Sequence, residues 1–500
     1  MEPTVDISGK TLLTVDENLL FLKKFFGNGI DLVENKYEIF SNHLSVGLAY
    51  IESVTDHKVV MEHLVMPLLQ CSNSMYEGPD NILQLLQTRT ISATDTHQTS
   101  DMSQVIGCIL NGDTVLFIEN ENNALTVGTR EVAKKAIDAP ENEATVLGSQ
   151  ESFCSDIGMN TSLIIKRLPT PNLHFEAFTL GTLSCTKIKL IWLEGVANPE
   201  IINEVRSRIL KIDTDNVDGI GIIGELIEDS PLSLFPKYRQ TERPDVVARN
   251  LTDGHFSIIC SNSPFAFIGS VSLWDNFRSM DDYEERSLTS SYLRIIRYVA
   301  FVLSILTSSL YLAFITYNQS IVPPTLALSI AAGREGVPFP SAFELLLLTF
   351  FITVIREAGL RMPGSVGFFV ATLAAIVIGQ AIVTAGYVSS SLIIVIAIST
   401  ISAFAISTTT LLYPARLLNY AFILLAGCFG IFGIISGIVF LFWHLITLSS
   451  FGVPYLYPLV PFDKDGIKDV IVRSRISVLK KRMKLLSPKN RVRTSEKGTK

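Results

Sequence analysis

The sequence predicts an α/β soluble N-terminal region of two small subdomains, followed by an all-α polytopic membrane domain. Of the 500 residues, 48% are hydrophobic and 18% charged, and several long apolar runs lie between Ser341 and Thr447. Residues 1–295 contain 23 Lys and Arg against 41 Asp and Glu, a net charge of −18, whereas residues 296–500 contain 18 against 7, a net charge of +11. The length exceeds one hydrophobic core, and the acidic N-terminal region argues against a nucleic-acid partner.

Residues 1–140 are expected to form the first α/β subdomain. Val15–Phe26 has the apolar spacing of a helix, and Asn111-Gly112 between two β-rich runs predicts a hairpin. The N-terminus, MEPTVDISGK, lacks a basic-then-apolar leader, so we expect this region to stay in the cytoplasm. The predicted strands are His43–Glu52, Val105–Leu110 and Ala124–Val127.

Residues 141–159 form the predicted linker, because the stretch 138–150 is polar and begins beside a proline. Residues 160–278 are expected to form the second α/β subdomain, in which alternating helices and strands predict a small mixed sheet with helices packed on it. The predicted strands are His174–Thr179, Ile188–Leu193 and Phe256–Cys260, and the predicted helices are Pro199–Leu210, Gly219–Ile227 and Pro244–Leu251.

Residues 279–462 are expected to form the membrane domain, with about five helices. A capping signal at Ser279–Asp282 and the absence of Pro and Gly up to Pro323 predict one long helix over Met280–Tyr317. Four prolines in Val322–Pro340 predict a re-entrant or interfacial segment. The further predicted spans are Ser341–Ile355, which is short unless it extends through Arg356–Gly359, then Val366–Ala385, Ser391–Leu412 and the glycine-rich Leu417–Thr447.

Residues 463–500 are a basic tail, with eleven Lys and Arg from Arg473 onward, which predicts contact with anionic lipid on the cytoplasmic side. Two cytoplasmic ends require an even number of crossings, whereas five are predicted. Three solutions remain open: the glycine-rich last segment crosses twice, Ser450–Phe462 returns through the membrane, or one terminus lies outside.

Motifs for catalysis, cofactors and metals are weak. Gly219–Gly224 matches GxGxxG, but a helix end and an acidic turn precede it instead of a strand, which disfavours dinucleotide binding. The histidines are scattered without metal-ligand spacing, and no nucleophile has a recognisable base. The six cysteines are far apart and are expected to be reduced, buried thiols. We therefore expect no enzyme activity, cofactor or metal.

Ionisable residues at membrane depth are the candidate gating or assembly residues, because such groups are costly unless paired or hydrated. They are Glu344, Arg356, Glu357, Arg361, Pro363 and Gln380, with Pro363 and Gln380 as accompanying breaks in the apolar pattern. Three interpretations remain open for the charged residues 356–361: interfacial side chains with an intrahelical pair between Glu357 and Arg361, a structural pair within an oligomer, or a pore or gate. Gln380 is expected to bond across helices or line a polar path.

A second candidate cluster is Thr241–Asp245, with the sequence TERPD. Pro244 suits the first turn of a helix, so one interpretation is a simple helix start. The other is a charged contact between domains or subunits, formed by Thr241, Glu242, Arg243, Pro244 and Asp245.

Six segments in order over more than 200 residues resemble the GerA family, the A subunits of bacterial spore germinant receptors. They are FPKYRQTERPDVVARNL (Phe235–Leu251), DDYEERS (Asp281–Ser287), AAGREGVPFPSAFELL (Ala331–Leu346), REAGLRMPGSVG (Arg356–Gly367), GQAIVTAGYVS (Gly379–Ser389) and SFGVPYLYPLVPF (Ser450–Phe462). Two features depart from the family pattern. Leu147–Phe153 lacks the Pro and Arg of a GPREGF-like box, and Val472–Ser477 lacks a proline.

The resemblance implies a multi-pass protein of the inner spore membrane with a cytoplasmic two-part N-terminal region. It also implies a homo-oligomer around an ion path, assembled with a transporter-like B subunit that binds nutrient and a lipid-anchored C subunit. The resulting hypothesis is a receptor subunit that converts germinant binding by a partner into opening of an ion-conducting path. Two alternatives remain: a transporter carrying substrate within this chain, and a non-conducting membrane scaffold.

Overall fold

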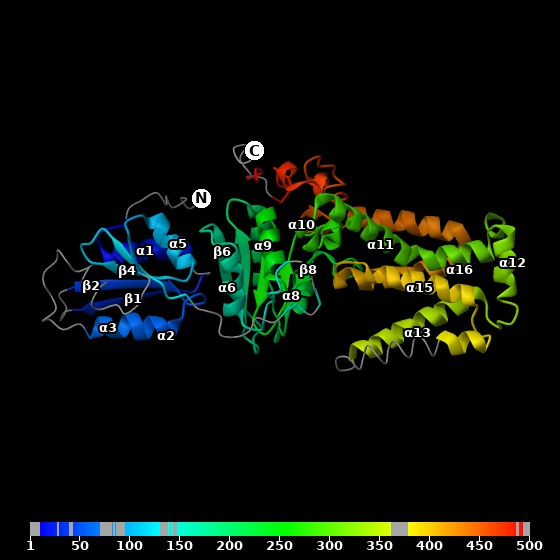
Figure 1. Cartoon of the computed structure of the whole chain (residues 1–500), viewed down its shortest axis with the longest axis horizontal. Coiled ribbons are helices and arrows are strands. Elements are labelled where there is room, and N and C mark those ends of the chain that lie inside the picture. Colours follow the sequence, from blue (N-terminus) through cyan, green and yellow to red (C-terminus); the bar gives the residue numbers. More distant parts are fainter. Residues whose placement is uncertain are drawn as a thin grey trace. The chain divides into compact units, whose positions relative to one another are not determined.

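The structure, a computed structural model, contains two compact units. It describes residues 11–361 and 379–493, apart from gaps at 28–29, 40–43, 71–82, 84–85, 87–95, 131–138, 141, 144–147 and 487–489. The N-terminal unit comprises residues 1–231, 238–271 and 480–500, and the helical unit comprises residues 232–237 and 272–479. Figure 1 shows the helices and strands of both units.

The first sheet of the N-terminal unit has the order β1-β2-β4-β5-β3, with every pairing antiparallel. Helices cover both faces (Figure 1). Helix α1 packs so closely that a Cβ at Gly47 on β2 would lie 2.5 Å from Val15 Cγ1, while Val60, Leu64 and Leu68 fill the opposite face. The elements are α1 (Val15–Phe26), β1 (Leu32–Ile39), β2 (Leu44–Ile51), α2 (His57–Val60), α3 (Met66–Leu69), β3 (Thr96–Thr99), α5 (Met102–Leu110), β4 (Thr114–Ile118) and β5 (Ala124–Val127).

The predicted strand Val105–Leu110 is wrong, because these residues form the end of helix α5. The Asp101 carboxylate accepts a hydrogen bond from Ser103 N–H and caps this helix. Asn111-Gly112 therefore joins a helix to β4 and is not a hairpin turn. The apolar run was too short for its periodicity to separate a buried helix from a strand.

The second sheet has the order β6-β7-β9-β10-β8, and its pairings are also antiparallel, so the mixed sheet was wrong. Helix α9 does connect two strands of the same direction, β8 and β9, but β10 inserts between them. Helix α6 begins within the predicted linker because Asp156 caps it. The elements are α6 (Ile157–Arg167), β6 (Leu173–Leu180), β7 (Thr186–Leu193), α7 (Pro199–Leu210), α8 (Ile220–Ile227), β8 (Arg239–Thr241), α9 (Pro244–Asp253), β9 (Ser257–Cys260) and β10 (Ala266–Ile268).

The helical unit packs around buried apolar residues such as Leu312, Leu345 and Ile423. Among its described helices, α11 and α16 are long and apolar enough to cross a membrane. The predicted span Ser391–Leu412 ends early, at Phe404, and the predicted span 366–385 lies mainly outside the described residues. The helices are α10 (Asp281–Glu284), α11 (Ser287–Thr316), α12 (Pro324–Ala332), α13 (Ser341–Arg361), α15 (Ser390–Phe404) and α16 (Thr409–Thr447).

Helix α16 folds back on itself at Gly430, where the backbone leaves helical geometry (φ 60°, ψ −138°). A Cβ at Gly437 would lie 2.8 Å from both Leu425 Cδ1 and the Phe422 ring. In a continuous helix, residues 425 and 437 would be about 18 Å apart. The Tyr317 hydroxyl donates to the Gly427 carbonyl at 2.6 Å and so satisfies a group freed by the break. The last segment therefore consists of two arms joined at Gly430.

A buried ion cluster breaks the predicted helix Met280–Tyr317 into α10 and α11. The Asp282 carboxylate on α10 accepts hydrogen bonds from Arg294, at 3.0 Å, and from Arg297, at 2.8 Å. Arg294 also lies 3.0 Å from Asp469, and its side chain is fully buried. The chain must turn at residues 285–286 to bring Asp282 back onto α11, so a single straight helix was wrong.

The described part of the basic tail contacts protein in both units. In the helical unit, Arg473 donates to the Glu285 carbonyl at 3.1 Å. In the N-terminal unit, Arg482 donates to the Thr252 carbonyl at 2.7 Å, and Arg493 pairs with Asp253. Part of the positive charge is therefore used within the chain.

We predict that Arg294→Met lowers the free energy of unfolding by about 3–5 kcal/mol, because it leaves two buried carboxylates without their shared cation. Thermal unfolding of the detergent-solubilised full chain measures this effect. Arg286→Met is the control, since Arg286 is exposed in the same segment. Equal losses in both variants would contradict a stabilising role for the cluster.

We predict an acid-sensitive contribution from Asp469. Burial alone would raise its pKa, but the guanidinium groups of Arg278 and Arg294, together with the Tyr283 hydroxyl, outweigh burial and lower the pKa below 3.8. A carboxyl with a lowered folded-state pKa contributes stability above its unfolded pKa and loses it as the pH falls through the folded value. Unfolding midpoints should therefore fall more steeply below about pH 4 in the wild type than in Asp469→Asn; parallel curves would contradict this.

Candidate functional site

The TERPD segment forms a buried polar cluster within the N-terminal unit. Pro244 begins α9, as one interpretation predicted. Arg243, only 1% exposed, binds both carboxylate oxygens of Asp245, at 2.6 and 3.1 Å, and the Glu143 carbonyl at 3.1 Å. Thr241 donates to the Glu143 carboxylate, which also pairs with Arg239. The segment is therefore both a helix start and a charged contact.

Glu242 ties the segment between the subdomains to this cluster. Its carboxylate accepts the backbone N–H groups of Asn142, at 2.6 Å, and Glu143, at 2.8 Å. Its own carbonyl accepts the Phe153 N–H at 2.7 Å. Thr241, Glu242 and Arg243 thus hold the connecting segment on the second sheet, while Asp245 pairs with Arg243 and Pro244 begins α9. No described residue of the cluster is arranged as a nucleophile with a base.

In the helical unit, Glu344 lies fully buried in the first turn of α13. Its Oε1 accepts the backbone N–H of Ser389 at 2.5 Å, and Ser389 is the N-cap of α15. Its Oε2 lies 4.0 Å from Arg334, which belongs to the turn after α12. Because a carboxylate near a helix N-terminus is stabilised by the exposed amides, Glu344 links the starts of α13 and α15.

The other predicted residues of this region do not gather around Glu344. Glu357 and Arg361 form the expected i, i+4 ion pair at 2.8 Å on the outside of α13, with side chains 55% and 79% exposed in a single chain. The Gln380 side chain is exposed. Its backbone carbonyl accepts a hydrogen bond from the Thr384 hydroxyl at 2.7 Å, within the same helix. Pro363 lies outside the described residues.

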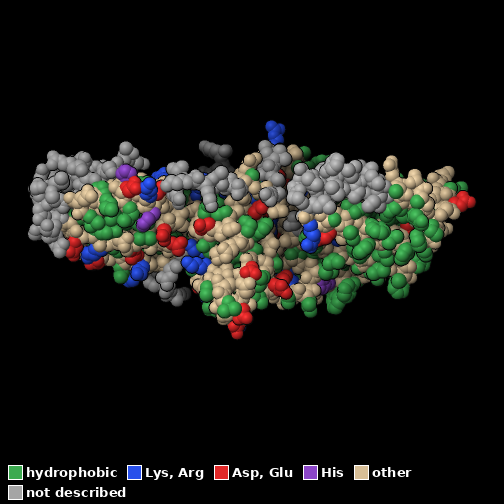
Figure 2. Space-filling model, turned by 90° about the horizontal axis from the view of Figure 1, so that it is seen from below, with side chains coloured by type: hydrophobic (Ala, Val, Ile, Leu, Met, Phe, Trp, Pro, Cys, Tyr) green, Lys and Arg blue, Asp and Glu red, His purple; other side chains and the backbone are tan. Residues whose placement is uncertain are grey.

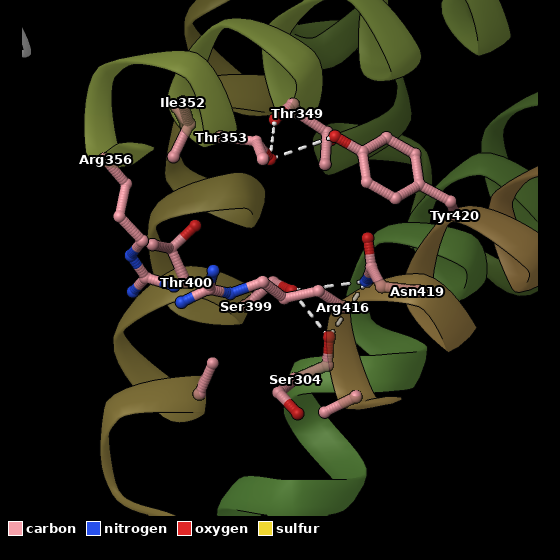
Figure 3. Close-up of a pocket in the computed structure, with 12 residues that line it drawn as sticks. Ser304, Thr349, Ile352, Thr353, Arg356, Ser399, Thr400, Arg416, Asn419 and Tyr420 are labelled. Carbon is pink, nitrogen blue, oxygen red and sulfur yellow. Dashed lines mark hydrogen bonds between the residues drawn. The ribbon is translucent and has the colours of Figure 1, made fainter. Parts of the chain in front are cut away.

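Arg356 instead lines a small cavity within the helical unit together with Arg416 (Figure 3). The Arg356 guanidinium lies 4.1 Å from the ring centroid of Phe404, a cation–π contact. Arg416 lies 5.4 Å from the ring centroid of Tyr413. The cavity has a volume of about 50 Å³. Its lining comes from α11, α13, α15 and α16: Ser304, Thr349, Ile352, Thr353, Arg356, Ser399, Thr400, Ala403, Ala415, Arg416, Asn419 and Tyr420.

Polar side chains cross-link the helices around the cavity (Figure 3). The Asn419 amide on α16 donates to the Ser304 carbonyl of α11 at 2.9 Å, and the Ser399 hydroxyl of α15 donates to the same carbonyl at 2.8 Å. On the opposite side, the Thr353 and Tyr420 hydroxyls are 3.0 Å apart. Three helices thus meet through one carbonyl oxygen.

The structure places no other chemical site at the remaining motifs. Gly219–Gly224 lies at the start of α8, without a preceding strand. Among the described residues, no group of His, Cys, Asp and Glu has the arrangement of a metal site. The described cysteines are free, but the expectation that they are buried holds only for Cys260, whose pKa burial raises to about 11; Cys185 and Cys428 are exposed.

Comparison with known proteins identifies the family of the chain. The family model "Bacillus/Clostridium GerA spore germination protein" matches residues 21–485. The chain belongs to the GerA family. Relatives include the membrane protein YfkQ of Bacillus subtilis (strain 168), 35% identical over 92% of this chain and 88% of the relative. Spore germination protein KA of the same strain is 33% identical over 95% and 87%.

A second group of matches comes from other species. Spore germination protein GerLA of Bacillus cereus is 33% identical over 96% of this chain and 98% of the relative. The crystal structure of the N-terminal domain of the A subunit of the Bacillus megaterium spore germinant receptor GerK3 is 26% identical. It covers 52% of this chain and 96% of the solved chain, with a TM-score of 0.43. The resemblance inferred from the six sequence segments is therefore confirmed at the level of the family.

Sequence reasoning missed Arg416, Asn419 and Ser304 at the cavity. Arg416 follows Pro414 near the start of an apolar helix, where an arginine is usually interfacial. Asn419 lies three residues after Arg416, so both polar side chains are on one face of the helix. This spacing was the available sign that the face contacts protein. Sequence alone did not indicate that the same face meets Arg356.

We predict that Glu242→Ala loosens the connecting segment, because it leaves the amides of Asn142 and Glu143 without their acceptor. Because Asn142 is exposed and Glu143 half-buried, water partly replaces the lost acceptor, and the expected cost is about 1 kcal/mol. Hydrogen–deuterium exchange of the full chain should be faster at residues 142–143. Glu225→Ala, on an exposed position of α8, serves as the control. Unchanged exchange at residues 142–143 in Glu242→Ala would contradict the tie.

Proposed function

We propose that this chain is the membrane subunit of a nutrient-responsive spore germination receptor. In this proposal it is not an enzyme, and it converts germinant binding by a transporter-like partner into opening of an ion-conducting path in an oligomer. A lipid-anchored subunit completes the receptor, in the inner membrane of the spore. Membership of the GerA family supports the receptor role, and the GerK3 relative is the A subunit of a spore germinant receptor.

The surface of the helical unit supports its placement in a membrane. Large apolar side chains are exposed along its helices, and Figure 2 shows them gathered over this unit. Apolar patches of this extent are unusual on a soluble surface. They include Val302 on α11, Ile398 and Ile401 on α15, and Phe432, Val439, Phe440 and Trp443 on α16.

The fold-back of α16 supports an even number of crossings. Each arm has on the order of 20 residues, about the length that a membrane helix needs. With α11, α13, α15 and the predicted span at 366–385, the two arms bring the proposed total to six. Both ends of the chain then lie on the cytoplasmic side, where the unused lysines and arginines of the tail would face anionic lipid.

The gating proposal is based on the buried carboxylate of Glu344. A carboxylate buried among apolar helices is costly unless protein groups hold it. Here it joins the starts of α13 and α15 through a single hydrogen bond and a 4.0 Å contact with Arg334. In this proposal the junction has two arrangements, one with the Glu344–Ser389 hydrogen bond formed and one with it broken. Shifting an equilibrium from 1:99 to 99:1 needs about 5.5 kcal/mol, which is roughly 1 kcal/mol per subunit in an assembly of about five.

We predict that Glu344→Ala changes ion release from nutrient-treated spores, because it removes the group that joins α13 to α15. The rate should change by at least about tenfold, corresponding to about 1.4 kcal/mol, with the receptor present at its normal level. Glu335→Ala provides the matched control, since Glu335 is exposed in the neighbouring turn. Unaltered ion release in Glu344→Ala at normal receptor levels would favour a non-conducting scaffold.

We predict that Glu357→Ala discriminates the single chain from the assembly. The Glu357–Arg361 pair is exposed in one chain, where such pairs contribute about 0–1 kcal/mol. If neighbouring subunits cover the pair, the variant should dissociate more readily than the wild type, while the isolated chain unfolds at nearly the same temperature. Native mass spectrometry measures the first effect and thermal unfolding the second. An oligomer that persists unchanged would argue against a contact at this pair.

A further inference from the structure

The cavity between α11, α13, α15 and α16 contains two cationic side chains that have no acidic partner in the described part of the chain. None of its twelve described lining residues is Asp or Glu. Arg356 Nη2 and Arg416 Nε are buried and have no hydrogen-bond partner among the described residues. In Figure 3 both guanidinium groups are on the same side of the cavity. Two like charges in an apolar bundle repel each other, and their unpaired donors are costly.

We propose that this cavity is a binding site for a phosphate group, held by Arg356 and Arg416. Guanidinium groups match the oxygens of a phosphate with paired N–H donors. Two arginines supply a charge of +2, which suits a phosphate dianion better than a single carboxylate. The Thr353 and Tyr420 hydroxyls, 3.0 Å apart at the other side of the cavity, offer additional donors.

The size of the cavity restricts the ligand. A volume of about 50 Å³ holds on the order of four water molecules. This space suits one phosphate group and is too small for an enclosed nucleotide. Both arginines are only half-buried, so the site is open to a group that enters from outside. The phosphate can therefore be inorganic phosphate or the headgroup of an anionic lipid.

Binding would hold two helices together. Arg356 belongs to α13 and Arg416 to α16, and each is oriented by an aromatic side chain, Phe404 and Tyr413. One phosphate bound by both guanidinium groups would replace their repulsion by two attractive contacts. The site concerns the stability of this chain itself and does not depend on its role in germination.

Thermal unfolding of the full chain in an uncharged detergent tests the site. Increasing inorganic phosphate should raise the unfolding midpoint beyond the effect of sodium chloride at the same ionic strength, and the rise should saturate. Arg356→Gln and Arg416→Gln should each weaken the apparent affinity at least about tenfold. Arg475→Gln should leave it unchanged, because Arg475 is exposed in the same unit and does not line the cavity. If Arg416→Gln does not fold, Arg416→Lys replaces it. Lysine keeps the positive charge but lacks the paired N–H donors of the guanidinium group, so it should weaken phosphate binding measurably.

A second arm of the experiment identifies the source of the phosphate. The chain is placed in nanodiscs of phosphatidylcholine alone or with phosphatidylglycerol. Stabilisation by phosphatidylglycerol that Arg416→Gln abolishes, without a response to inorganic phosphate, would assign the site to a lipid headgroup. Absence of any response to both probes, or a response that is equal in the wild type and in both glutamine variants, would overturn the proposal.

Discussion

The helical unit depends on one constraint: polar groups among apolar helices need partners from the protein, because apolar side chains supply none. The Tyr317 hydroxyl meets this need at the break of α16, where it binds the Gly427 carbonyl. Asn419 and Ser399 meet it between helices, through the Ser304 carbonyl. These contacts determine where α16 can reverse and how α11, α15 and α16 pack.

The same constraint separates firmly held charges from poorly held ones. Arg294 forms ion pairs with both Asp282 and Asp469, so the positive and negative charges at the start of α11 nearly cancel. Glu344 has one hydrogen bond and a long contact with Arg334 among the residues that the structure describes. The ion cluster lies at the start of α11, whereas Glu344 lies near the turn after α12, at the other end of the helices (Figure 1). A well-paired end and a weakly satisfied carboxylate at the opposite end are expected of a unit with a fixed end and a movable junction. This difference is the physical basis of the gating proposal.

Sequence patterns predicted the elements whose periodicity was long or whose caps were explicit. Val15–Phe26 and Pro199–Leu210 match α1 and α7, and the helix predicted from Pro244 begins there. Errors arose where tertiary contacts override local preference. Asp282 accepts the Ser279 backbone N–H, as its capping position predicted, but it also binds Arg294, and the turn that this contact needs divides the predicted helix. Periodicity cannot report such a contact, because it depends on a residue twelve positions away.

The candidate site was predictable only in part. Glu344 and the Glu357–Arg361 pair follow from charge within apolar sequence and helical spacing. The cavity does not, because Arg356 and Arg416 are sixty residues apart in sequence and meet through packing alone. The sequence indicated that the glycine-rich last segment could be broken, but not that it reverses at Gly430, because this reversal depends on the packing of Tyr317 against the glycine.

The most direct test of the proposed membrane placement of the helical unit is electron paramagnetic resonance of the full chain in liposomes. Spin labels would be placed singly at Val302, Ile398 and Val439, after replacement of the native cysteines. The account predicts high accessibility to oxygen and low accessibility to a water-soluble nickel reagent at all three positions, because they face lipid. Preferential accessibility to the nickel reagent at these positions would contradict the account.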